Sequence, residues 1–130
     1  MQFSRIVALA FTCLAFTAPA FSETGPMSGA DIKRDIIGKR IFLAAPLGGE
    51  LPLNYRRNGR VDGSGEAVGL GRMLAPSDSG RWWIKGNALC QKWQEWYDGR
   101  QFCFTITKLS SSSIRWQRDD GESGLARIGS

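Results

Sequence analysis

The fold is decided by residues 80–107, which read GRWWIKGNALCQKWQEWYDGRQFCFTIT. Apolar and polar residues alternate on both sides of Gly86-Asn87, and alternation with a period of two is typical of β-strands. A two-residue turn at this dipeptide places Ile84 opposite Leu89 in an antiparallel hairpin. The stretch therefore predicts antiparallel β-structure in the middle of the chain.

Cys90 and Cys103 extend this register to a third strand. If the two cysteines pair, Leu89 lies opposite Phe104, and apolar residues of separate stretches fall on one face of the sheet. We expect a Cys90–Cys103 disulfide for this reason. The predicted core face consists of Trp82, Ile84, Leu89, Trp93, Phe102, Phe104, Ile106, Ile114 and Trp116.

The first hairpin illustrates how register is chosen. A two-residue turn at Asn58-Gly59 would set apolar residues against acidic ones, which is unfavourable in a core. A three-residue loop that ends at Gly59 instead places Tyr55 opposite Val61 and Leu53 opposite Gly63, because glycine supplies the left-handed conformation such a loop needs. We therefore predict the three-residue loop.

Turn residues recur every eight to twelve residues or so from Arg40 onward, which is the pattern of an antiparallel meander. Eight short strands of this kind suit a small closed barrel or a tight sandwich. We predict an all-β fold, a small antiparallel meander barrel of about eight strands. The predicted strands are Arg40 to Ala44, Glu50 to Arg56, Arg60 to Ala67, Arg81 to Ile84, Ala88 to Trp93, Arg100 to Thr107, Ser113 to Gln117 and Gly124 to Ile128.

The disulfide excludes a tight turn at Asp98-Gly99. Such a turn would offset the cysteines by four residues, about 13 Å, which exceeds the Cα separation of a disulfide. Gln94 to Gly99 should therefore form a wider loop with Trp96 and Tyr97 at its tip. Exposed aromatic residues on loops often mark recognition, so Trp96 and Tyr97 are the candidate ligand-binding residues. The alternative is that they fold back over the end of the barrel.

One short helix should precede the barrel. Ser28-Gly29-Ala30-Asp31 has the form of a capping box, in which the serine and the acidic residue each accept a backbone hydrogen bond. Ile32, Ile36 and Ile37 follow at the spacing of one helix face, and Gly38 stands where a helix commonly ends.

The N-terminus reads as a secretory signal peptide. Arg5 precedes an apolar run from Ile6 to Ala18, and Ala18-Pro19-Ala20 has the small residues of a cleavage site. Thirteen helical residues reach about 20 Å, short of the hydrocarbon core of about 30 Å, so we expect no membrane anchor after cleavage. Cys13 departs with the signal, which leaves two cysteines for the oxidising periplasm or exterior.

The chain of 130 residues has room for one domain. We divide it into a signal peptide (1–22), a flexible lead with the short helix (23–39) and the β-barrel domain (40–130). The sequence contains no histidine, which removes triad and histidine-metal chemistry. We therefore expect a protein that is not an enzyme and that holds no cofactor and no metal.

Basic residues outnumber acidic ones, which gives a formal net charge of +5. The charge is spread along the chain without a run of Lys and Arg, so we expect salt-sensitive surface binding and no specific nucleic-acid site.

Gly80-Arg81-Trp82-Trp83, the motif from Leu89 and Cys90 to Trp93, and Cys103-Phe104 occur in this order. The order resembles small secreted single-disulfide proteins of unknown function that are common in Gram-negative, especially alphaproteobacterial, genomes. This resemblance implies a periplasmic β-barrel of lipocalin-like appearance and supplies no activity.

The function expected from these features is a non-enzymatic periplasmic binding or envelope-associated module. Its partner would be a small molecule, a glycan or an envelope protein. The alternative is an inhibitor of an envelope-directed hydrolase such as lysozyme, because periplasmic lysozyme inhibitors share the size, the export and the single disulfide.

Overall fold

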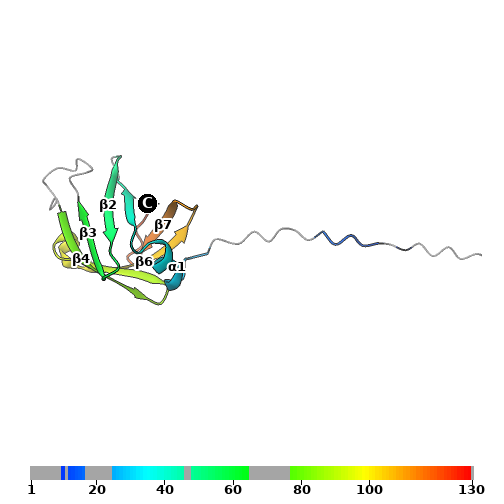
Figure 1. Ribbon diagram of the computed structural model, residues 1–130, viewed down its shortest axis with the longest axis horizontal. Coiled ribbons are helices and arrows are strands. Elements are labelled where there is room, and N and C mark those ends of the chain that lie inside the picture. The colour runs from blue at the N-terminus through cyan, green and yellow to red at the C-terminus, as the bar shows by residue number, and fades with distance from the viewer. Residues whose placement is uncertain (1–9, 11, 17–24, 46–47, 65–76, 130) are drawn as a thin grey trace, which may run out of the picture.

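Antiparallel strands follow one another along the chain and close into an eight-stranded barrel in the computed structural model (Figure 1). The structure describes residues 10, 12–16, 25–45, 48–64 and 77–129. Each strand pairs with the next, and the last pairs with the first. The strands are β1 (Arg40–Ala44), β2 (Glu50–Tyr55), β3 (Arg60–Ser64), β4 (Ser77–Lys85), β5 (Ala88–Trp93), β6 (Gln101–Lys108), β7 (Ser113–Arg118) and β8 (Ser123–Ile128). The predicted meander barrel is thereby confirmed.

The predicted registers hold in both hairpins. Tyr55 lies opposite Val61 across β2 and β3, which confirms the three-residue loop. Ile84 lies opposite Leu89 across β4 and β5, and Cys90 opposite Cys103 across β5 and β6. The side chains on the inner face fill the barrel, as expected for a closed barrel of eight strands.

Strand β4 differs most from the prediction, because it begins at Ser77 instead of Arg81. Ser77 to Gly80 have low strand propensity, but they pair with β3 residue by residue, and this pairing fixes their conformation. Three parts of the prediction lie outside the described residues. These are most of the signal peptide, the start of the lead, and the last three residues of the strand predicted to end at Ala67.

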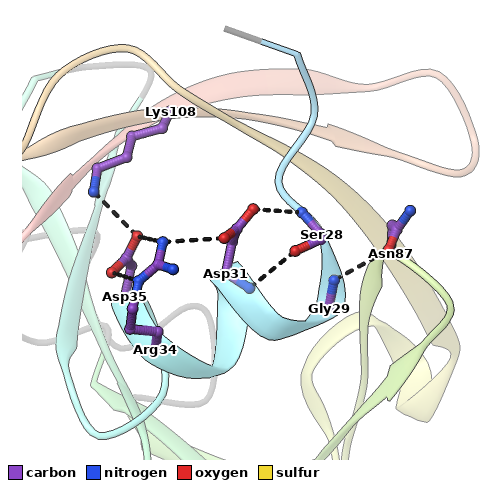
Figure 2. Close-up of polar contacts among 7 residues, drawn as sticks. All are labelled: Ser28, Gly29, Asp31, Arg34, Asp35, Asn87 and Lys108. Atoms are coloured by element: carbon purple, nitrogen blue, oxygen red, sulfur yellow. Dashed lines mark hydrogen bonds and ion pairs between the residues drawn. The ribbon is translucent and has the colours of Figure 1, made fainter.

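Helix α1 (Gly29–Asp35) covers one end of the barrel. Its predicted capping box is present, with Ser28 and Asp31 each accepting a backbone hydrogen bond from the other. Ile32 and Ile36 are fully buried in the barrel core. Gly29 donates its backbone N–H to the side chain of Asn87 in the β4–β5 turn, which fixes the start of the helix (Figure 2).

Charged side chains fix the other end of α1. The Asp35 carboxylate accepts a hydrogen bond of 3.1 Å from Lys108 at the end of β6, and it also pairs with Arg34 (Figure 2). The end of the expected flexible lead is held nearby, since Met27 is buried and donates its backbone N–H to the carbonyl of Ile106. The helix is thus tied to two hairpins that lie more than 50 residues after it in the sequence.

Cys90 and Cys103 form the predicted disulfide. Cys90 is completely buried, and the register sets it opposite Trp83 on the outer face of the barrel. A buried disulfide is compatible with an oxidising location. In the part of the chain that the structure describes, no helix is long and apolar enough to cross a membrane.

Candidate functional site

The candidate site lies at the end of the barrel opposite α1, which we call the mouth. The connection between β5 and β6 is found here, and it contains a short helical turn, η3 (Trp96–Gly99). The wide loop predicted between these strands is therefore confirmed, with Trp96 and Tyr97 inside it. The hairpin between β7 and β8 lies at the same end, because neighbouring strands are antiparallel.

Asp78 fixes the start of η3. Its carboxylate accepts hydrogen bonds of 2.9 Å from the backbone N–H of Glu95 and 2.8 Å from that of Trp96. Asp78 lies opposite Gly63, on the inner face of β4 at the mouth. One carboxylate thereby satisfies two backbone donors of the loop, and hydrogen bonds to an ionised acceptor are the stronger kind.

Trp96 folds back over the mouth, which is the alternative stated above for this loop. Its ring centroid lies 4.6 Å from that of Trp93, and the side chain is half-buried. A Cβ atom on Gly63 would lie 2.8 Å from the Trp96 ring, so this glycine provides the space that the ring occupies. The large apolar surface of the indole explains why it packs instead of facing solvent.

Tyr97 remains at the surface, with an exposed fraction of 45%. Its backbone and that of Asp98 are left-handed, with φ of 57° at both residues. Such a conformation is uncommon away from glycine and costs free energy that the surrounding structure must offset. The strained turn presents the Tyr97 ring edge-on to Phe102, at a centroid distance of 5.5 Å.

Arg118 lies beside these two rings. Its guanidinium carbon is 4.2 Å from the ring centroid of Phe102 and 5.5 Å from that of Tyr97, and its side chain is only 10% exposed. The Asp120 carboxylate accepts hydrogen bonds from Nε and Nη2, which raises the pKa of Arg118. The described residues of the mouth therefore place a cation next to aromatic faces, an arrangement that cation–π attraction favours.

A cavity of about 50 Å³ lies below the mouth on the barrel axis. Most of its lining is apolar, and it reaches from Trp96 and Tyr97 down to Ile36 of α1. Tyr55 donates a hydrogen bond of 2.6 Å to Gln91 in this lining. Burial raises the pKa of Tyr55 far above its ordinary value, and the neighbouring Tyr97 adds to the shift, so the phenol stays protonated.

Two indole N–H groups beside the cavity lack acceptors. The Nε1 atoms of Trp93 and Trp116 are buried and have no hydrogen-bond partner among the described residues. A buried donor without an acceptor costs roughly 1 to 3 kcal/mol. A bound molecule that carried an acceptor oxygen would remove part of that cost.

The size of the cavity limits what it can hold. Pockets for small organic ligands usually measure about 300 to 1,000 Å³, so this cavity admits such a ligand only if the Trp96 ring moves out. The described residues also contain no cluster of metal-ligating side chains. The arrangement is suited to binding an apolar group next to a cation.

Sequence reasoning missed Asp78, Gly63 as a packing site and Arg118. Asp78 belongs to the part of β4 that was not predicted as a strand, and Arg118 lies one residue beyond the predicted end of β7. The period-of-two pattern contained the signal for Arg118, because Trp116 and Arg118 share a face of that strand.

The chain matches no family model, no curated protein and no solved structure. Its likeness to lipocalins is one of appearance, an antiparallel eight-stranded barrel with one disulfide. An architecture of this kind does not identify a ligand.

Proposed function

We propose that this protein is a non-enzymatic binding module of the periplasm, and that it binds a small amphipathic anion at the mouth of its barrel. The apolar part of the ligand takes the place of the Trp96 ring, and its carboxylate lies next to Arg118. The observation that carries this proposal is the position of Trp96 directly above an apolar cavity. The resemblance noted above and the predicted signal peptide support the location.

The start of η3 is anchored through its backbone. The Asp78 carboxylate accepts hydrogen bonds from the backbone N–H groups of Glu95 and Trp96. The left-handed residues Tyr97 and Asp98 store backbone strain close to the ring, and strain of this kind concentrates at ligand-binding loops. In this proposal the Trp96 ring acts as a lid over the cavity that it lines.

Thermal denaturation with hexanoate, octanoate and decanoate tests the proposal. We expect the melting temperature of the wild-type protein to rise with acid concentration and with chain length, because each buried methylene contributes about 0.8 kcal/mol. Tryptophan emission should change with the same midpoint, because the Trp96 ring becomes exposed to solvent.

Two matched variants locate the binding. The emission change should become smaller in Trp96→Phe, where Trp93 and Trp116 at the cavity still respond. It should persist in full in Trp83→Phe, because Trp83 lies on the outer face. A wild-type melting temperature that none of the acids alters, or an unchanged spectral response in Trp96→Phe, would contradict binding at the mouth.

Inhibition of an envelope-directed hydrolase is the second candidate function, and the backbone of η3 favours it. The exposed Tyr97 is held in one conformation by the strained turn, and a preorganised loop loses little entropy when it enters a partner's cleft. Stoichiometric loss of lysozyme activity, abolished by Tyr97→Ala, would favour the inhibitor over the small-molecule module.

A further inference from the structure

Three cations form a row across the outer face of the barrel. Arg60 of β3 lies opposite Arg81 of β4, and Arg81 lies opposite Lys92 of β5. Adjacent strands are about 4.8 Å apart, so the three side chains leave the sheet close together. We call Arg60, Arg81 and Lys92 the cationic row.

The row is exposed, and its charges are not balanced by ion pairs. All three residues are exposed, and none of them makes an ion pair with a carboxylate of the described residues. Arg60 instead donates a hydrogen bond to the hydroxyl of Ser79. Like charges directly opposite each other destabilise a sheet, so the row is costly to the fold on its own.

The cationic row lines a surface groove of about 960 Å³. The groove runs over β3, β4 and β5, from the β2–β3 turn to the end of η3. Its other lining residues supply neutral hydrogen-bonding groups from Asn58, Ser79 and Gln94, one carboxylate from Asp98, and the half-buried ring of Trp83. Cations, amide and hydroxyl groups and an aromatic ring therefore meet in one depression.

We propose that this groove binds an acidic glycan. The cationic row would pair with the carboxylate, sulfate or phosphate groups of the chain. The amides of Asn58 and Gln94 and the Asp98 carboxylate suit sugar hydroxyls, which both donate and accept hydrogen bonds. The flat ring of Trp83 suits the apolar face of a sugar ring. The proposal is independent of the mouth site, since the groove lies outside the barrel.

The groove fits a glycan better than a nucleic acid. Proteins that bind single strands stack successive bases on several aromatic rings, whereas Trp83 is the only accessible ring among the described residues of this groove, because Trp93 is buried.

Binding of a heparin octasaccharide, measured by titration calorimetry with the full chain, tests this proposal. Arg81→Gln removes the central cation, and Arg115→Gln removes the same charge from the outer face of β7, away from the groove. We expect Arg81→Gln to weaken binding by about tenfold, the loss of one charge-assisted hydrogen bond, and Arg115→Gln to change it little. The slope of log affinity against log salt should fall by about one in Arg81→Gln only.

Four results would overturn the proposal. The first is no binding of the octasaccharide by the wild-type protein. The second is equal weakening in both variants, which would indicate diffuse attraction to net charge. The third is equal affinity for maltooctaose, which is uncharged. The fourth is tighter binding of a single-stranded DNA octamer, which would identify the groove as a nucleic-acid site.

Discussion

The carboxylate of Asp78 accepts a hydrogen bond of 2.8 Å from the backbone N–H of Trp96. Asp78 lies at the start of β4, among residues of low strand propensity that pairing with β3 keeps extended. The β3–β4 pairing thus places Asp78, and Asp78 places the backbone of Trp96 at the mouth.

Asp78→Ala should release η3. Two backbone N–H groups lose their acceptor, so we expect a loss of about 1 to 3 kcal/mol in the free energy of unfolding, measured by urea denaturation. Asp78→Asn keeps one acceptor oxygen and should cost less. Tryptophan emission of Asp78→Ala should shift to longer wavelength. Equal stability of both variants and the wild type would mean that η3 is held by other contacts.

The local registers could be predicted from the sequence because single residues decide them. Gly86-Asn87 fixes one hairpin, Gly59 fixes another, and the cysteine pair joins β5 to β6. Where two strands are set by such features, the period of two assigns every side chain to a face. The same register already sets Arg81 opposite Lys92, although no run of basic residues appears along the chain.

The packing at the mouth could not be predicted in this way. Trp96 is half-buried because Gly63, more than thirty residues earlier, leaves space for its ring. Arg118 meets Tyr97 only because the barrel closes β7 and the β5–β6 loop around one end. Contacts of this kind depend on the shape of the whole barrel. Neither strand propensity nor the period-of-two pattern of the sequence predicts that shape.

Alanine substitutions should rank the mouth aromatics by burial. Trp93 is 2% exposed, so Trp93→Ala should lower the free energy of unfolding by about 3 to 5 kcal/mol. Trp96→Ala should lower it by less, because the ring is half-buried, and Tyr97→Ala by the least. Urea denaturation of the three variants tests the ranking. A loss in Tyr97→Ala as large as that in Trp93→Ala would contradict it.

The disulfide predicts a defined thiol count. In the full chain only Cys13 is free, so one equivalent of iodoacetamide should react before reduction and three after reduction and unfolding. Reduction should lower the free energy of unfolding by about 3 kcal/mol, because the bond closes a short loop in the unfolded chain. Intact mass measures the number of alkylated thiols. Three reactive thiols in the unreduced protein would contradict the structure.

Stability should fall at acid pH through Asp35. Hydrogen bonds from Arg34 and then Lys108 lower the pKa of this carboxyl from 3.8 to about 2. A lowered pKa contributes stability that is fully present above pH 3.8 and lost as pH falls through about 2. The difference in melting temperature between wild type and Asp35→Asn should therefore be larger at pH 6 than at pH 2. Lys108→Gln should reduce this difference in part, and a difference independent of pH would contradict the assignment.

Arg81→Gln should stabilise the protein while it weakens binding in the groove. Arg81 lies between Arg60 and Lys92, so its removal relieves two like-charge pairs directly opposite each other, each of which costs a few tenths of a kcal/mol or so. We expect the free energy of unfolding in urea at low salt to rise by about 0.5 kcal/mol. Added salt screens exposed charges, so the gain should shrink as salt is raised. Arg115→Gln is the control, because Arg115 lies opposite Thr107 and Leu125, and it should show no such gain.

A row of cations that destabilises its own sheet is expected where those cations serve binding. Unchanged or lower stability of Arg81→Gln at low salt would show that the row carries no cost, and this argument for a binding role would be lost.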